Sequence, residues 1–341
     1  MSGTSDCVKE PGRRAGARFV MPPILRRRWS VGIRGLLIVP LLLACARHEP
    51  VPGSTTVHPA EDAAALETWR IVSYNIRHGR GADNEVDLER TAAVLRRLDP
   101  DVVALQEVDQ GVARSGGEDQ AARLGELLGM HHAFGAFMDY QGGHYGMAIL
   151  SRCAIRRVDP VRLPDGNEPR VALAVELERP SGDALPLTVV NVHFDWVEDD
   201  GYRYAQAQEV ARYVDGVAGP LVLLGDFNDQ PGSRTLALFR GRVREAAKPA
   251  DRRLTFPSDT PEREIDYIFV APADVWEIVE VDVIPEAVAS DHRPVVAEFR
   301  LSRTERAGIA LGRAVAGVRE ARSEPVPAAG GRCAFDPAAG R

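Results

Sequence analysis

Hydrophobic and polar positions between residues 68 and 302 follow two different periods, which predicts an α/β domain. Short, unbroken, β-branched runs are typical of strands buried on both faces. The predicted strands are Trp69–Ile76, Val102–Gln106, Tyr145–Leu150, Arg170–Leu177, Leu185–Phe194, Leu221–Leu224, Ile265–Val270 and Pro294–Leu301. No internal repeat is visible, so one α/β domain is favoured over two.

Apolar residues at helical spacing predict helices between several of these strands. The predicted helices are Leu88–Leu98, Asp119–Met130, Tyr202–Val217 and Ser233–Phe239. Asp87 is a suitable start for the first helix, and Pro100 ends it. A hydrophobic content of 45% is sufficient for a packed core.

Residues 1–45 lack this pattern and are typical of an N-terminal extension followed by a signal peptide. A basic segment precedes the apolar stretch Gly35–Ala44, which is too short to span a bilayer and has the length of a signal-peptide core. Cys45 follows directly in the sequence LLAC, which resembles the lipobox of bacterial lipoproteins. We therefore expect lipidation at Cys45, with a plain cleaved signal or an uncleaved anchor as the alternatives.

Two further segments flank the predicted domain. Residues 46–67 contain Pro, Gly, Ser and Thr without apolar periodicity, which predicts a flexible tether. Residues 303–341 are rich in Ala, Gly, Arg and Pro, which predicts a low-complexity, disordered tail. We expect an exported protein that is anchored by lipid to the bacterial membrane and faces the periplasm or the exterior.

The charge of the domain limits the class of partner. Residues 71–300 contain 39 acidic and 25 basic side chains, a net charge of −14, whereas the whole chain carries −7. An acidic surface disfavours long duplex nucleic acid. A bound metal ion reverses the potential locally, so small phosphate groups remain acceptable partners. We expect the protein to be a monomer.

Lysine and cysteine are both rare. Lys9 and Lys248 are the only lysines, with arginine elsewhere, and we attribute this to a composition bias of the genome because nothing local requires it. The four cysteines, which are Cys7, Cys45, Cys153 and Cys333, have no zinc-ligand spacing and indicate no disulfide framework. Cys153 is expected to be a small buried apolar residue.

Polar side chains stand at the ends of several predicted strands. They are Asn75, Glu107, Asn191, His193, Asp226, Asn228, Asp266, Asp291 and His292. Each alone has a structural explanation, such as a loop cap, an Asx-turn or a core histidine. Together they offer carboxylates for a hard divalent cation, amides for phosphate or water and histidines for proton transfer. Such a set of groups is suited to the hydrolysis of a phosphate ester.

The order of these residues resembles the endonuclease/exonuclease/phosphatase family of metal-dependent phosphodiesterases, over nearly all of residues 68–302. The resemblance implies a four-layer α/β/β/α sandwich of two mixed sheets with outer helices. Gly111–Gln120, Glu168–Arg170 and Thr255–Pro257 are similar to a secreted bacterial branch and to a domain of eukaryotic proteins that remodel glycosylphosphatidylinositol lipids.

The resemblance also implies a metal site. Glu107 corresponds to the principal ligand of Mg²⁺ or Mn²⁺, Asp291 to a further ligand, and Asn75 contacts both the metal region and the scissile phosphate. Whether one or two ions bind stays open. Arg114 and Arg170 are candidates for phosphate or head-group contacts, with surface salt bridges as the alternative.

The catalytic roles follow from the same resemblance. Asp226 orients or deprotonates the attacking water, and Asn228 stabilises charge in the transition state. His193 contacts a phosphate oxygen, and Asn191, on the same face of the strand, is a substrate-binding candidate that supports it. Asp266 fixes the tautomer of His292. Either Asp226 or His292 is the general base.

The sequence thus favours an extracytoplasmic Mg²⁺-dependent phosphoesterase that acts on phospholipid head groups or small phosphoesters. A secreted nuclease on DNA or RNA is the first alternative, because the aromatic side chains of Phe194, Trp196, Tyr202 and Tyr204 can stack the bases of single strands. The same side chains can equally dock acyl chains or pack against the next helix. A non-catalytic binding lipoprotein that keeps the fold is the second alternative.

Overall fold

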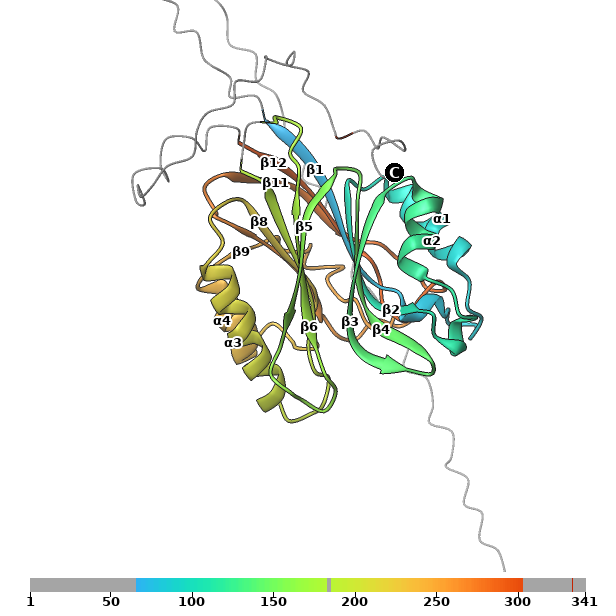
Figure 1. Ribbon diagram of the computed structural model, residues 1–341. Helices are drawn as coiled ribbons and strands as arrows, with labels where there is room; N and C mark the ends of the chain where they lie inside the picture. The colour runs from blue at the N-terminus through green and yellow to red at the C-terminus, as the bar shows by residue number, and fades with distance from the viewer. Residues whose placement is uncertain (1–65, 183–184, 303–332, 334–341) are drawn as a thin grey trace, which may run out of the picture. The chain divides into compact units, whose positions relative to one another are not determined.

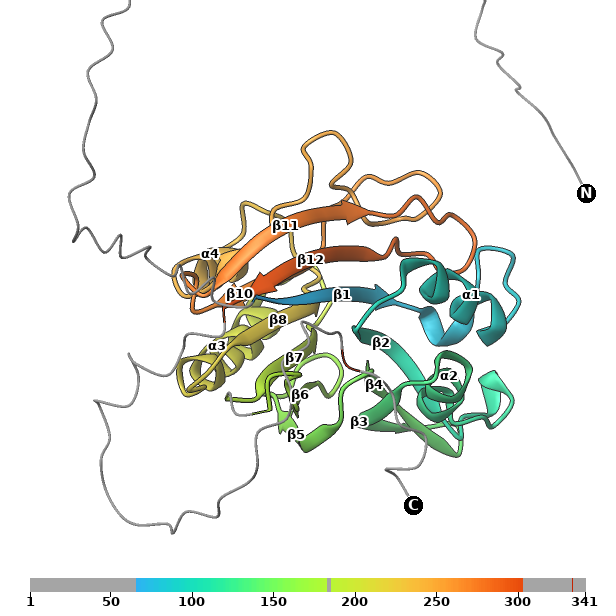
Figure 2. The same ribbon diagram turned by 90° about the horizontal axis from the view of Figure 1, so that it is seen from above.

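Two six-stranded β-sheets pack face to face in the computed structural model, which describes residues 66–182, 185–302 and 333 (Figure 1). These residues all belong to one structural unit, Ala60–Arg341. Helices cover the outer face of each sheet (Figure 2). The predicted four-layer α/β/β/α sandwich of two mixed sheets is therefore confirmed.

The first sheet has the strand order β11-β12-β1-β2-β4-β3. Its strands are β1 (Glu67–Asn75), β2 (Val102–Gln110), β3 (His131–Tyr140), β4 (Gly143–Ser151), β11 (Trp276–Val283) and β12 (Val295–Leu301). β1 and β2 are parallel and the other pairs are antiparallel. The helices α1 (Leu88–Leu98) and α2 (Gln120–Leu128) bury Leu95 and Leu124 against the outer face.

The second sheet has the strand order β5-β6-β7-β8-β10-β9. Its strands are β5 (Ile155–Arg162), β6 (Val171–Leu177), β7 (Leu187–His193), β8 (Leu221–Asp226), β9 (Arg244–Glu245) and β10 (Asp266–Ala271). β7 and β8 are parallel, and the connection between them contains α3 (Gly201–Asp215). With α4 (Arg234–Arg240), this helix covers the outer face over a cluster that includes Phe227, Phe239 and Phe269.

All eight predicted strands and all four predicted helices are present, with ends shifted by a few residues. The strands that the sequence analysis missed are β3, β5, β9 and β11, and these are the four edge strands of the two sheets. An edge strand has one hydrogen-bonded neighbour and often one solvated face, so its sequence lacks a continuous apolar run. In β5, for example, no residue is buried.

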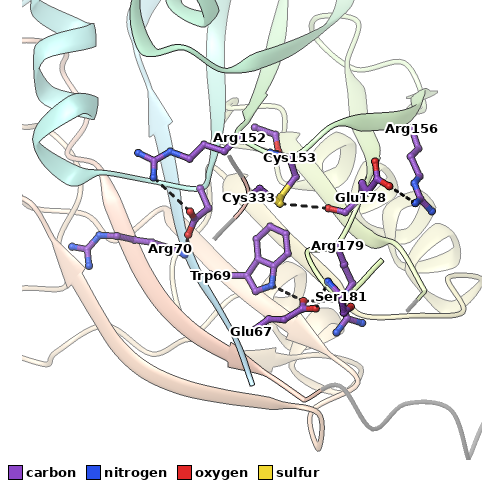
Figure 3. Close-up of a disulfide and its surroundings, with 12 residues drawn as sticks. Glu67, Trp69, Arg70, Arg152, Cys153, Arg156, Glu178, Arg179, Ser181 and Cys333 are labelled. Carbon is purple, nitrogen blue, oxygen red and sulfur yellow. Dashed lines mark hydrogen bonds and ion pairs between the residues drawn. A yellow bond between two sulfur atoms is a disulfide. The ribbon is translucent and has the colours of Figure 1, made fainter. Parts of the chain in front are cut away.

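Cys153 and Cys333 form a disulfide, which corrects the expectation that Cys153 is only a small core residue (Figure 3). Cys153 follows β4, whose end pairs with Val102 at the start of β2. The disulfide therefore lies at the end of the first sheet where β2 begins, and it connects part of the predicted tail to the domain. The remainder of 303–341, like Cys45 and residues 1–65, lies outside the described residues.

The N-terminal boundary of the domain differs slightly from the predicted one. β1 begins at Glu67, which was assigned to the tether, and the Glu67 carboxylate pairs with Arg179 Nε at 2.9 Å in a buried ion pair (Figure 3). Among the described residues, no helix is both long and apolar enough to cross a membrane.

We predict that the variant with both Cys153→Ser and Cys333→Ser is less stable than the parent protein by about 2–4 kcal/mol, because the disulfide closes a long loop in the unfolded chain. Chemical denaturation under non-reducing conditions measures the difference. Added reductant should lower the stability of the parent and leave that of the variant unchanged. Equal stability of the two proteins without reductant would contradict this prediction.

Candidate active site

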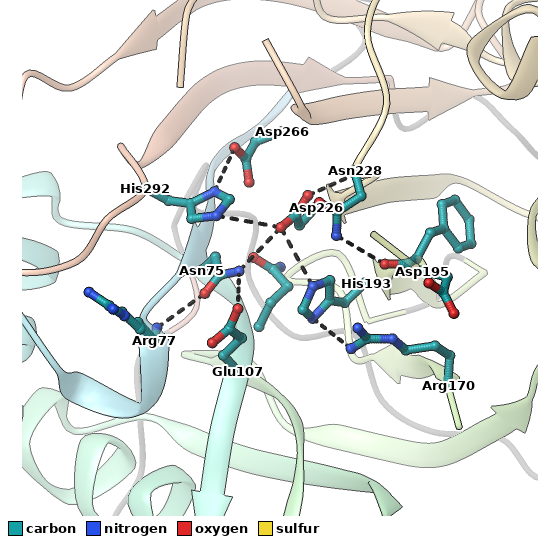
Figure 4. A network of polar contacts seen from close by, with 12 residues as sticks. Asn75, Arg77, Glu107, Arg170, His193, Asp195, Asp226, Asn228, Asp266 and His292 are labelled. Atoms are coloured by element: carbon teal, nitrogen blue, oxygen red, sulfur yellow. Dashed lines mark hydrogen bonds and ion pairs between the residues drawn. The ribbon is translucent and has the colours of Figure 1, made fainter. Parts of the chain in front are cut away.

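The polar residues predicted from strand ends converge where the two sheets meet (Figure 4). Asn75 is the last residue of β1, and Glu107 lies in the neighbouring β2. In the second sheet His193, Asp226 and Asp266 stand directly opposite one another on β7, β8 and β10. Paired residues present their side chains on the same face of a sheet, so these three reach the same region.

Glu107 has a positive φ of 56°, at a register shift between Leu105 and Val108 of β2. A non-glycine residue in this left-handed region is unfavourable, and such residues are concentrated at functional sites. The bulge re-aims one side chain of the strand. This bulge explains how the Glu107 side chain reaches the cavity, although the residues before and after it in β2 are buried.

The amide of Asn75 joins carboxylates from both sheets. Its Nδ2 donates to Glu107 Oε1 at 3.0 Å and to Asp226 Oδ2 at 3.2 Å. Its Oδ1 accepts from the backbone N–H of Arg77 at 3.1 Å, so the amide orientation is fixed. Asn75 is fully buried and thereby sets the spacing of the two acids.

His292 lies between two carboxylates. Its Nδ1 is 3.0 Å from Asp266 Oδ2, and its Nε2 is 3.6 Å from Asp226 Oδ2. Burial opposes a charge on His292, but Asp266 and Asp226 prevail and raise the pKa of the imidazole to about 10. Burial raises the pKa of Asp226 to about 7, with His292 acting against this and Asp266 supporting it. Asp226 and His292 therefore each favour the charged form of the other across 3.6 Å.

His193 has the opposite surroundings. Arg170 Nη1 lies 3.2 Å from its Nδ1, and a guanidinium only donates, so this nitrogen is the acceptor. Its Nε2 is 3.6 Å from Asp226 Oδ2. Burial and then the charge of Arg170 hold the pKa of His193 well below its usual range. His193 is thus suited to donate a hydrogen bond as a neutral ring.

Asn228 lines the cavity, as predicted, and it also takes part in an Asx-turn, which was the alternative interpretation of this motif. Its backbone N–H donates to Asp226 Oδ1 at 2.9 Å, which closes that turn, and its own φ is 49°. Its Nδ2 donates to the carbonyl of Phe194 at 3.0 Å. The turn fixes the Asp226 carboxylate while the Asn228 side chain still borders the cavity.

Most of these residues line a cavity of about 400 Å³, whereas Asn75 and Asp266 are buried and do not line it. Its polar lining consists of Glu107, Arg114, Glu168, Arg170, His193, Asp226, Asn228, Arg263, Asp291 and His292, and its apolar lining of Met138, Tyr140, Tyr145, Trp196, Phe256 and Ile265. Trp196 is 59% exposed, which is unusual for so large an apolar side chain. Acidic groups from strands of both sheets and from two loops thus face one space of small-molecule size.

Arg114 and Arg170, which were predicted to contact the substrate, both form ion pairs with acidic residues of the protein. Arg114 pairs with the buried Asp109 through two hydrogen bonds of 2.9 and 2.8 Å, and its guanidinium lies 4.6 Å from the ring centres of both Tyr140 and Tyr145. Arg170 pairs with Glu168 at 3.0 Å. Both arginines border the cavity, so the salt bridges that were the alternative interpretation coexist with the predicted location.

Asn191 does not reach the cavity, which corrects its assignment to the substrate. Its Oδ1 accepts from Gln106 Nε2 at 2.7 Å, and its Nδ2 donates to the carbonyls of Leu105 and Ala148 at 2.8 and 3.1 Å. The residue is fully buried between the sheets. Its role is therefore to connect them.

The acidic groups fit a metal ion by their chemistry. Asp226, Asp266 and His292 offer ligand atoms within 4.8 Å of one another. Glu107 and Asp291 add carboxylates to the same cavity, and Asp291 Oδ2 has a neighbouring charge in Arg77 Nε at 3.4 Å. Oxygen-rich sets of this kind suit hard divalent cations.

Several lining residues were missed by the sequence analysis. Tyr140 belongs to the unpredicted edge strand β3, and Arg263 lies in a loop with its guanidinium over the ring of Phe256 at 4.5 Å. No local pattern distinguishes such residues. The Thr255–Pro257 segment was noted only as part of a family resemblance, and it places Phe256 4.9 Å from the His292 ring.

Comparison with known proteins gives a consistent assignment. Residues 72–292 match the Endonuclease/Exonuclease/phosphatase family. The chain is 27% identical to the Escherichia coli protein YbhP over 252 residues, which covers 69% of this chain and 97% of YbhP.

Solved structures show the same fold. An endonuclease/exonuclease/phosphatase from Beutenbergia cavernae has a TM-score of 0.55 and 26% identity, and the match covers 69% of this chain and 72% of that one. A mannosyl-6-phosphatase from Bacteroides thetaiotaomicron has a TM-score of 0.55 and 20% identity, covering 68% of this chain and 99% of that one.

We predict that Asn191→Ala destabilises the protein by about 1–3 kcal/mol for each buried polar group that loses its partner. Equilibrium unfolding in urea measures the loss. The exposed Asn167 provides the control, since Asn167→Ala should leave stability unchanged. A stable Asn191→Ala protein would show that the hydrogen bonds between the sheets contribute little.

Proposed function

The chain belongs to the endonuclease/exonuclease/phosphatase family, and from this premise we propose that it is a metal-dependent hydrolase of phosphate esters. The observation that carries the proposal is that the buried amide of Asn75 joins Glu107 and Asp226, and that these two acids line one cavity together with His292. Such a set supplies metal ligands and a proton-transfer pair within reach of one substrate group.

We propose that Glu107, Asp291 and Asn75 hold the ion, with Mg²⁺ or Mn²⁺ as the expected metal. These cations prefer oxygen ligands. We do not include His292 among the ligands, because each of its ring nitrogens already has a carboxylate nearby. When bound, the ion neutralises negative charge on the phosphate group and on the leaving oxygen.

The remaining steps use side chains of the chain itself. Asp226 and His292 act as one pair that takes a proton from the attacking water and returns one to the leaving oxygen. Asp266 orients His292 through Nδ1. His193 and Asn228 border the same space, and the neutral ring of His193 donates to a phosphate oxygen.

We propose a small phosphoester or a phospholipid head group as the substrate. The cavity has room for one small ligand, and the domain carries a net charge of −14 over residues 71–300. Apolar groups at Met138, Tyr140 and Trp196 suit an amphiphilic substrate. Single-stranded nucleic acid is the alternative that the exposed Trp196 favours.

The proposed location is outside the cytoplasm, with a lipid anchor at Cys45. A basic segment, an apolar core and the LLAC sequence support it. The disulfide between Cys153 and Cys333 adds support, because such bonds persist mainly in oxidising compartments.

We predict that the protein hydrolyses at least one of bis-p-nitrophenyl phosphate, phosphoinositides, single-stranded DNA or abasic duplex, and that removing metal with EDTA abolishes turnover. Asp226→Asn and His292→Gln should each lower kcat by about 10²–10⁴-fold, because each removes half of the proton-transfer pair. Release of product is measured with and without Mg²⁺, together with the thermal midpoint of each variant.

His144 provides a control, since it is an exposed histidine that hydrogen-bonds to Asp139 at 2.9 Å and does not line the cavity. His144→Gln should keep full activity. Unchanged turnover in folded Asp226→Asn and His292→Gln would contradict the assigned roles. No turnover of any substrate by the metal-loaded parent would favour a non-catalytic binding lipoprotein.

A further inference from the structure

The only lysine of the catalytic domain, Lys248, is buried beneath the candidate active site. The chain has 42 basic residues, and Lys9 is the only other lysine. The Lys248 side chain is 0% exposed, and its ammonium is 3.1 Å from Glu264 Oε1 and 4.1 Å from the centre of the Tyr267 ring. A buried charge is retained only with specific partners, so a local requirement, and not composition alone, explains this lysine.

The third partner is the backbone of a site residue. Lys248 Nζ donates to the carbonyl of Asp266 at 2.8 Å. Two residues further along β10, the carbonyl of Ile268 accepts from the backbone N–H of Ala246 at 2.9 Å. Carbonyls two residues apart face the same side of a strand, and β9 ends at Glu245. Lys248 therefore continues the hydrogen bonding along β10 beyond the end of β9.

Asp266 depends on this support because its carboxylate has few contacts. One oxygen, Oδ2, is 3.0 Å from His292 Nδ1, and the other, Oδ1, is buried without a hydrogen-bond partner among the described residues. The position of the carboxylate is then set mainly by the backbone at the start of β10. The compact ammonium of Lys248 contacts three partners, which are Glu264, the Asp266 carbonyl and the Tyr267 ring. The larger, planar guanidinium of an arginine would not fit the same set of contacts.

We propose that Lys248 is a positioning residue that holds Asp266, and through it His292, in the orientation for proton transfer; this inference rests on the proposed function. Lys248 does not line the cavity. Its loss should therefore lower kcat and leave KM nearly unchanged.

The test compares Lys248→Met with two further variants. Lys248→Met should lower kcat on the order of 10–100-fold, as expected when a reacting group is misplaced. It should also shift or broaden the downfield NMR signal of the proton between His292 Nδ1 and Asp266. In the double variant with Lys248→Met and Glu264→Gln, the buried Glu264 no longer carries a charge, so stability should recover while kcat stays low.

Arg179→Met is the matched control, because Arg179 forms a buried ion pair with Glu67 in which each side chain is 1% exposed. It should lose stability and keep kcat and the NMR signal. The proposal is overturned if kcat of Lys248→Met equals that of Arg179→Met when both are folded, or if the double variant recovers kcat. If the parent protein is inactive but shows the downfield signal, and Lys248→Met alters that signal, only the proposed function is rejected.

Discussion

One buried amide, that of Asn75, joins the two sheets at the candidate active site. It donates to Glu107 of the first sheet and to Asp226 of the second, so two acids that belong to different layers are held at a fixed spacing. The arrangement exists only while the sheets are packed against each other. Asn191 and Gln106 secure that packing with further buried hydrogen bonds, at 2.7 Å between them. Polar contacts of this kind specify one alignment of the sheets, which apolar packing alone does not.

The two histidines of the site have different charge states because their neighbours carry opposite charges. His292 faces Asp266 and Asp226, which favour a charged ring, whereas His193 faces Arg170, which favours a neutral one. Their different settings follow from the strand order, because β10 and β8 bring acids to one ring and the segment before β6 brings a guanidinium to the other. Environments that separate the pKa values of like groups are typical of acid–base sites.

Much of this architecture was predictable, for physical reasons that also explain the failures. Central strands such as β7 are buried along their whole length and have clear apolar runs, and the site residues stand where such runs end. The edge strands lack that pattern, so Tyr140 was missed with β3. Asn191 was assigned to the wrong task because spacing along a strand does not show which layer a buried amide contacts. Cys153 and Lys248 were missed for a related reason, since their partners are distant in sequence or belong to the backbone.

The disulfide between Cys153 and Cys333 determines what remains of the protein after a protease cuts the chain between them. The two cysteines are 180 residues apart, and the segment between them contains the whole second sheet together with β11 and β12. A protease that cuts once anywhere within this segment leaves both pieces covalently joined. The nicked molecule would migrate as one species until it is reduced, and the halves of its cavity would not diffuse apart.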